Sequence, residues 1–141
     1  MTNQFPIHDL FIRKLDIIEG DGEVRIPILS FNDHLLRRFG FAESVQLEPG
    51  PRSTMKIREV ADEIWALIYG KVRYVWHDLR STSPTRQQKF TMICEEPTQV
   101  LVPFGVAFGV EALEEPALLL RLASHTEGEC HDDRTIPWEM E

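Results

Sequence analysis

Two short apolar runs joined by a two-residue turn constrain the fold of this chain most strongly. Residues 64–69 and 72–78 are rich in β-branched and aromatic side chains, and Gly70 and Lys71 separate them. Glycine readily adopts the positive φ that tight turns require, and two-residue connections are typical of β-hairpins. The pattern predicts a hairpin formed by strands 64–69 and 72–78, in which Tyr69 pairs with Val72.

Further short apolar runs follow, and turn-forming residues separate them. The breaks contain the sequences EEP, PFG and EEP, beginning at Glu95, Pro103 and Glu114. Runs of this length between proline, glycine and charged residues are typical of a β-sandwich or barrel. We therefore predict an all-β chain with additional strands at Phe90–Cys94, Gln99–Val102, Ala107–Ala112 and Ala117–Ala123.

One short helix is expected at Asn32–Phe39. In such a helix Leu35, Leu36 and Phe39 share one face, Ser30 or Asn32 caps the start, and Gly40 ends it. The later run Leu118–Leu120 has no clear period of its own, but the turns on both sides favour a buried strand.

Composition limits the class of partner. A chain of 141 residues with 43% hydrophobic content suits one domain over residues 1–141. The sequence has no apolar run long enough for a membrane span and no signal-peptide pattern, so we expect a cytoplasmic protein. Its net charge of −8 disfavours nucleic-acid binding and favours a small-molecule ligand. Cys94 and Cys130 lack metal-type spacing, and a cytosolic disulfide is not expected.

Two later segments carry the most specific motifs. The sequence D-L-R-x-x-S-P-T spans Asp78–Thr85, and P-x-G-x-A-x-G spans Pro103–Gly109. Both resemble segments of the dTDP-4-dehydrorhamnose 3,5-epimerase family, a dTDP-sugar isomerase-like branch of the cupin superfamily. Glu63 and Gly70 also reproduce the E-x6-G spacing of cupins. The resemblance covers residues 15–138, and it implies a cupin-type antiparallel β-barrel (jelly roll) that forms a homodimer.

The resemblance also implies a chemistry that this chain does not retain. In that family a histidine base and a tyrosine acid move protons beside the C4 ketone of a nucleotide-linked sugar, without a metal or cofactor. Here the base position falls on Ser53 and the acid position on Arg121, and Phe108 replaces a further histidine. Serine needs its own base near neutral pH, and arginine stays protonated. Other family positions fall near Gly50 (an arginine), on Glu63 (a lysine) and on Asp132 or Asp133 (an aspartate).

No metal site is predicted. Metal-binding cupins use two closely spaced histidines, the glutamate and one more histidine. Lys56 to Glu59 precede Glu63 in this chain, and Phe108 takes the place of the last ligand. One carboxylate does not supply the three or four ligands that a transition metal needs.

Strand alternation predicts which side chains face the barrel interior. If Glu63 points inward, alternate residues of both strands of the predicted hairpin do so as well. The predicted ligand-binding residues are Trp65, Tyr74, Trp76, Phe108 and Arg121. The candidate catalytic residues are the carboxylates Glu63 and Asp78.

Two interpretations of this interior stay open. In one, aromatic side chains fill it, and Arg121 neutralises Glu63 or Asp78. In the other, which we favour because burial of these charges is costly, aromatics contact a sugar and charged groups bind its hydroxyls. The two carboxylates act as acid and base only if their environments separate their pKa values, and pairing with Arg121 is the simpler expectation. The nearby cations Arg52, Lys56, Arg58 and Arg73 form either an anion-binding rim or, as we expect, a surface of mixed charge.

The sequence therefore predicts a sugar or nucleotide-sugar epimerase/isomerase-like cupin of surface-polysaccharide metabolism that lacks the usual catalytic pair. The alternative is a non-catalytic cupin module for ligand binding or protein association. An open pocket favours the first function, and a filled barrel favours the second.

Overall fold

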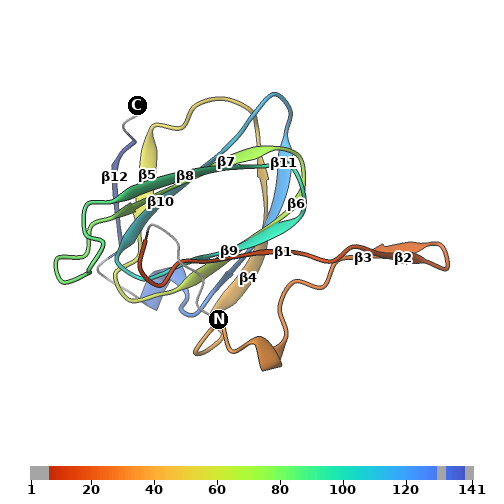
Figure 1. Ribbon diagram of the computed structural model, residues 1–141, viewed down its shortest axis with the longest axis horizontal. Helices are drawn as coiled ribbons and strands as arrows, with labels where there is room; N and C mark the ends of the chain where they lie inside the picture. The colour runs from red at the N-terminus through yellow and green to blue at the C-terminus, as the bar shows by residue number, and fades with distance from the viewer. Residues whose placement is uncertain (1–6, 130–132, 139–141) are drawn as a thin grey trace.

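Two five-stranded antiparallel sheets packed face to face make up the barrel (Figure 1). The computed structural model describes residues 7–129 and 133–138. The first sheet contains, in spatial order, β1 (Phe11–Lys14), β9 (Thr98–Val102), β6 (Glu63–Tyr69), β11 (Ala117–Ala123) and β4 (Phe41–Leu47). The second contains β12 (Arg134–Pro137), β5 (Thr54–Ile57), β10 (Val106–Ala112), β7 (Val72–Asp78) and β8 (Lys89–Cys94). This all-β arrangement is the predicted jelly roll.

Two further strands lie outside the barrel. They are β2 (Ile18–Gly20) and β3 (Glu23–Arg25), which pair only with each other and extend away from it (Figure 1). Among the residues described, the structure contains no helix that is long and apolar enough to cross a lipid bilayer. A short 3-10 turn, η2 (Glu127–Glu129), precedes β12.

The four strands predicted after the first pair are confirmed. Three of them, β8, β9 and β10, begin one residue earlier than predicted, and β11 has the predicted bounds. The run Leu118–Leu120 is part of β11 and not helical. The proline, glycine and acidic residues between the apolar runs therefore predicted the ends of these four strands to within one residue.

The predicted hairpin of β6 and β7 is wrong, although both strands exist. They belong to different sheets, so Tyr69 pairs with Leu118, and Val72 pairs with Ala112 and Cys94. Gly70 has a φ of 108°, and a Cβ at this position would lie 2.8 Å from the Cα of Ala117. The glycine thus forms a corner at which the chain passes from the first sheet to the second instead of folding back on itself.

The predicted helix at residues 32–39 is also wrong beyond its first turn. Only η1 (Phe31–Asp33) forms, with Ser30 as its cap, and His34 follows in the left-handed region with a φ of 52°. The Asp33 side chain accepts a hydrogen bond from the Ser30 amide and pairs with Arg13 of β1. These contacts hold the segment against the first sheet, which overrides its weak helical pattern.

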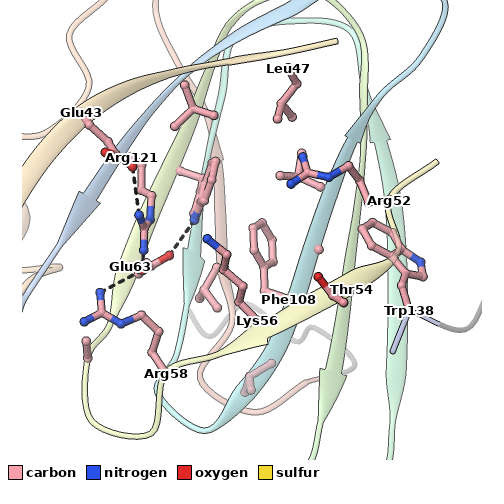
Figure 2. Close-up of a pocket in the computed structure, with 17 residues that line it drawn as sticks. Glu43, Leu47, Arg52, Thr54, Lys56, Arg58, Glu63, Phe108, Arg121 and Trp138 are labelled. Atoms are coloured by element: carbon pink, nitrogen blue, oxygen red, sulfur yellow. Dashed lines mark hydrogen bonds and ion pairs between the residues drawn. The ribbon is translucent and has the colours of Figure 1, made fainter. Parts of the chain in front are cut away.

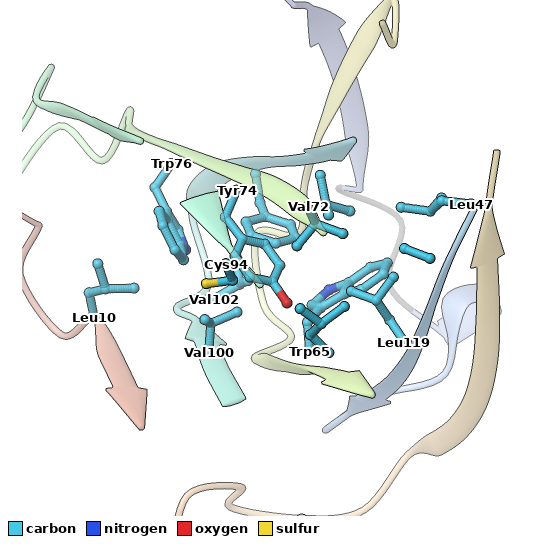
Figure 3. Close-up of a cluster of buried hydrophobic side chains, with 14 of the residues drawn as sticks. Leu10, Leu47, Trp65, Val72, Tyr74, Trp76, Cys94, Val100, Val102 and Leu119 are labelled. Carbon is cyan, nitrogen blue, oxygen red and sulfur yellow. The ribbon is translucent and has the colours of Figure 1, made fainter. Parts of the chain in front are cut away.

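Large side chains fill the part of the barrel between β9, β6 and β7 (Figure 3). Tyr74 and Trp76 of β7 are fully buried there, and their ring centroids lie 5.7 Å apart. Phe108 of β10 contacts both rings, at 5.8 and 5.6 Å. Aromatic pairs at these separations add to the burial energy of a core. This half of the barrel is therefore a packed core.

Candidate functional site

The other half of the barrel encloses a cavity, between the β4 side of the first sheet and the β5 side of the second (Figure 2). Its volume is about 140 Å³. A single water needs only about 10–15 Å³ on this measure, so the cavity accommodates a ligand much larger than an ion. The residues that line it are Glu43, Val45, Leu47, Arg52, Thr54, Lys56, Arg58, Ala61, Glu63, Trp65, Val102, Val106, Phe108, Gly109, Val110, Arg121 and Trp138.

Glu63, the first residue of β6, is the centre of a buried ion-pair network. Its Oε2 accepts hydrogen bonds from Arg58 at 3.0 Å and from Arg121 at 2.5 Å, and its Oε1 accepts one from Trp65 at 2.9 Å. Burial alone would raise the pKa of Glu63, but the hydrogen bonds and charges of these partners outweigh it and hold the pKa below its usual value. Glu63 is therefore a carboxylate in a stable pair.

Arg121, on β11, is held from several sides. It donates to Glu43 at 2.9 Å in addition to Glu63, and its guanidinium lies 4.9 Å from the ring of Phe41 and 5.7 Å from that of Trp65. Burial would lower its pKa, but the carboxylates raise it above the ordinary arginine value. This side chain stays cationic, so it cannot serve as a general acid.

Arg58 closes the network on the other side. It donates to Asp133 at 3.1 Å and to the carbonyl oxygens of His125 and Thr126, at 3.3 and 3.1 Å. The side chain is 8% exposed. Buried ion pairs need further hydrogen bonds to offset desolvation, and Arg58 has them through Asp133 and the two carbonyl oxygens.

Two further cations, Arg52 and Lys56, line the cavity, and they differ from Arg58 and Arg121 in having no carboxylate partner among the described residues. Arg52, which precedes the strand, and Lys56 lie on the same side of the chain as Arg58, since alternate residues face the same way. Neither has a hydrogen bond or ion pair to any residue that the structure describes. Four cationic side chains thus line the cavity against the two carboxylates of Glu43 and Glu63, and two of the cations are available to a ligand.

Aromatic side chains form the apolar wall. Trp65 and Phe108 lie 5.6 Å apart between their ring centroids, and both are more than nine-tenths buried. Trp138, which follows β12, lies against Gly109 so closely that a Cβ on that glycine would be 2.3 Å from the indole ring. The Trp138 amide donates to the carbonyl oxygen of Ser53, at 3.0 Å. This glycine therefore allows the indole to close one side of the cavity.

The substitution Gly109→Ala is expected to displace Trp138 and to lower the unfolding free energy by about 1–3 kcal/mol, the usual cost of overpacking. Tryptophan fluorescence and chemical unfolding measure the two effects. Gly128→Ala is the matched control, because a Cβ there meets no atom within 4 Å. Unchanged fluorescence and stability in Gly109→Ala would contradict the packing described.

The cavity contains four of the seven residues predicted as site residues: Glu63, Trp65, Phe108 and Arg121. Tyr74, Trp76 and Asp78 do face the interior, as strand alternation predicted, but they lie outside the cavity lining and are fully buried. The reason is lateral position, because β10 separates β7 from β5 within the second sheet. The interior is filled on the β7 side and contains a cavity on the β5 side.

Asp78 anchors the loop that follows β7. It accepts hydrogen bonds from Ser83 at 2.6 Å, from Thr85 at 2.7 Å, and from the backbone amide and side chain of Arg80. Burial would raise the pKa of Asp78, but these donors hold it well below the usual value. Arg80 and Thr85 also bond to the backbone of His8, at 2.7 and 2.8 Å. The motif D-L-R-x-x-S-P-T therefore fixes this loop to the N-terminal segment.

The positions that the family resemblance singled out have other surroundings here. Ser53 is exposed and does not line the cavity, and Gly50 forms a turn with a φ of 131°. Asp133 binds Arg58, whereas Asp132 lies outside the described residues. Within the part of the chain that the structure describes, no cluster of three or more His, Cys, Asp and Glu residues is placed to hold a metal ion.

Three of the four cations for which we expected a surface of mixed charge line the cavity instead. They are Arg52, Lys56 and Arg58, whereas the fourth, Arg73 of β7, pairs with Glu111 outside the cavity. The sequence does contain a pattern that indicates this placement: the cations stand at positions 52, 56 and 58, and an even spacing puts side chains on one face of a strand. Trp138 carried no such signal, because only the tertiary fold brings it to Gly109.

Comparison with solved structures shows which proteins share this fold. The dTDP sugar isomerase from Desulfovibrio desulfuricans G20 matches with a TM-score of 0.80 and 19% identity, over 98% of this chain and 88% of that one. The dTDP-4-dehydrorhamnose 3,5-epimerase of Bacillus anthracis, with TDP and PPi bound, matches with a TM-score of 0.79 and 18% identity, over 93% and 80%.

A third match is the Legionella pneumophila dTDP-6-deoxy-D-glucose-3,5-epimerase in complex with dTDP-4-keto-L-rhamnose. Its TM-score is 0.77 at 18% identity, over 92% of this chain and 73% of that one. No family model matches this sequence, and a comparison with curated proteins finds no match. The chain thus has the cupin-like fold of dTDP-sugar epimerases with a distant sequence.

Proposed function

We propose that the cavity between β4 and β5 binds a nucleotide-linked sugar, and that this protein is an epimerase/isomerase-like cupin of sugar metabolism. The observation that carries the proposal is the pair of cations, Arg52 and Lys56, that line the cavity without a counter-ion among the described residues. Cationic side chains form strong charge-assisted hydrogen bonds with phosphate oxygens. The proteins of similar fold that have TDP or a dTDP-linked sugar bound support the same ligand class.

The cavity wall suits the sugar end of such a ligand. Trp65 and Phe108 offer an apolar face, and Glu63 with its two arginines supplies fixed charges at one side. A concave, mostly apolar pocket with a few convergent polar groups is the usual form of a small-molecule site. We assign Glu63 to positioning Arg58 and Arg121, because a carboxylate with a lowered pKa is a weak proton acceptor.

The alternative function is a non-catalytic module for ligand binding or protein association. It is favoured by one observation, that both carboxylates lining the cavity are held in ion pairs and are not free to move a proton. The two functions share the ligand site and differ in chemistry. Homodimer formation and a cytoplasmic location remain predictions, and light scattering on the purified protein measures the first.

A thermal-shift titration tests ligand binding. A dTDP-linked 4-keto-6-deoxy sugar at 100 times its dissociation constant is expected to add about 2.7 kcal/mol of apparent stability. The double variant Arg52→Ala, Lys56→Ala is expected to bind at least about tenfold more weakly, because one hydrogen bond to a charged group contributes about 1.5–3 kcal/mol.

The matched control is Lys14→Ala with Arg25→Ala, which removes two exposed cations far from the cavity. This control is expected to bind as the wild type does. Equal binding by both double variants, or no thermal shift of the wild type with dTDP or any dTDP-linked sugar, would contradict the proposed ligand.

A further inference from the structure

The hairpin arm of β2 and β3, residues 16–25, is the part of the fold that the barrel supports least. Its two strands pair only with each other, and the arm extends away from the barrel (Figure 1). A two-stranded hairpin alone is marginally stable in water and needs a further strand or a packing surface. The arm is nevertheless regular, and Asp21 and Gly22 both have the positive φ of a tight hairpin turn. It therefore has the form of an element that packs on another surface.

One face of the arm combines exposed apolar side chains with acidic ones. Glu19 lies opposite Val24 in the register of the hairpin, and strand alternation places Ile17 on the same face. Val24 is 63% exposed and Ile17 is 50% exposed. The side chains of Asp16, Glu19 and Asp21 have no hydrogen bond or ion pair to the residues that the structure describes. Such a face fits a partner surface that is both apolar and cationic.

A groove of this kind lies in the segment that follows the arm, over residues 29–39. Its volume is about 520 Å³. The apolar side chains that line it include Phe31, Leu36 and Phe39, and the permanently charged ones are Arg37 and Arg38. Phe31 is 90% exposed and Phe39 is 66% exposed. Aromatic side chains this exposed next to arginines are typical of a protein interface.

The two arginines of the groove keep part of their surface available. Arg37 pairs with Asp62 at 3.5 Å and Arg38 pairs with Glu129 at 3.2 Å, and both arginine side chains stay about half exposed. The chain has a net charge of −8, so two copies repel each other over most of their surfaces. A groove lined by cations is therefore a favourable contact for the acidic arm of another copy.

The arm does not occupy the groove of its own chain. The link between them is fixed to the first sheet, because Gln99 donates to the carbonyl oxygen of Ile28 at 2.5 Å and Arg13 donates to the same oxygen at 3.4 Å. The groove thus begins against the barrel, whereas the arm extends away from it (Figure 1). The groove of a second copy can receive the arm, and twofold symmetry makes such an exchange reciprocal and closed.

We propose that two copies of this chain associate by exchanging arms, so that the face of Ile17, Glu19 and Val24 of each copy lies in the groove of the other. Apolar contacts with the groove supply the affinity. The acidic side chains of the arm lie near Arg37 and Arg38 and set the orientation. This association is independent of the ligand in the barrel cavity.

One substitution on each surface tests the proposal. Val24→Lys in the arm and Phe31→Asp in the groove are each expected to raise the dissociation constant of the homodimer at least about 100-fold. Each removes an apolar contact that contributes at least about tenfold, and the contact occurs twice in the dimer. The matched control is Ile93→Lys on β8, where the side chain is 52% exposed, and it is expected to associate as the wild type does. Analytical ultracentrifugation measures the constants, and circular dichroism checks that each variant is folded.

A mixture of the two variants distinguishes reciprocal exchange from other arrangements. The mixed dimer retains one wild-type contact, between the unchanged arm of Phe31→Asp and the unchanged groove of Val24→Lys. Its second contact places a lysine against an aspartate. Native mass spectrometry is therefore expected to detect the mixed dimer at a protein concentration at which each variant alone is a monomer.

The remaining outcomes would overturn the proposal. These are a monomeric wild type, a wild-type dimer that neither substitution weakens, and a pair of variants that do not associate when mixed. A dimer that only Val24→Lys weakens would show that the arm binds a surface other than the groove. None of these measurements needs a nucleotide sugar, so failure here leaves the proposed function intact.

Discussion

The substitution Glu63→Gln is expected to lower the unfolding free energy by about 3–5 kcal/mol, the cost of breaking a buried ion pair from one side. The loss is large because Arg58 and Arg121 then stay buried beside an amide that cannot balance their charge. Chemical unfolding of the two proteins measures the difference. Ligand binding is expected to weaken as well, since these arginines line the cavity.

The matched control is Glu43→Gln, which removes a second carboxylate from the same arginine. The Glu43 side chain is 44% exposed, so its pair with Arg121 contributes about 1 kcal/mol or less. Losses of similar size in the two variants would contradict the central role given to Glu63.

The pH dependence of this difference has a definite sign. The pKa of Glu63 in the folded protein lies below the usual value of 4.5, so its stabilising effect is complete above that value and is lost as the pH falls through the folded pKa. The stability gap between wild type and Glu63→Gln is therefore expected to shrink below about pH 4.5. Unfolding free energies measured between pH 7 and pH 3 check it, and a gap that widens in acid would contradict the ion-pair account.

A second large effect is expected from Asp78→Asn, about 3–5 kcal/mol of unfolding free energy. Asp78 accepts hydrogen bonds at both oxygens, from Arg80, Ser83 and Thr85, and an amide nitrogen at one position cannot accept them. The loop after β7 and the N-terminal segment around His8 are expected to loosen together. Chemical unfolding and amide hydrogen exchange in this region measure the two effects.

Asp9→Asn is the control for this prediction, because Asp9 is the exposed partner of the same arginine. It is expected to cost about 1 kcal/mol or less. A small loss of stability for Asp78→Asn would contradict its anchoring role, and weakened nucleotide-sugar binding without any loss of stability would assign Asp78 to the ligand site instead.

Most strands could be predicted from short apolar runs between turn residues, but the pairing of the strands could not be predicted in this way. The runs at Val72–Asp78 and Ala117–Ala123 are rich in apolar residues and bounded by turn residues, and their side chains alternate between more and less buried positions. The corner at Gly70 looks like a hairpin turn because the two-residue connection is the same in both cases. Which strand lies beside which depends on the distant partners β9, β10 and β11, and no short segment encodes them.

The site was predictable in part for a related reason. Alternation along strands correctly placed Glu63, Trp65, Phe108 and Arg121 on the interior, where the cavity is. It could not distinguish them from Tyr74 and Trp76, because the filled and open halves of the barrel differ in lateral position and not in strand parity. Lys56 lies on β5 and Trp138 follows β12, two strands that were not predicted from the sequence, so their convergence required the tertiary structure.

A crystal structure of the protein with dTDP-quinovose bound tests the central claim most directly. The account predicts that the sugar lies in the cavity beside Trp65 and Phe108, with phosphate oxygens within hydrogen-bonding distance of Arg52 or Lys56. A ligand bound elsewhere, with the cavity between β4 and β5 empty, would contradict the site proposed for this protein.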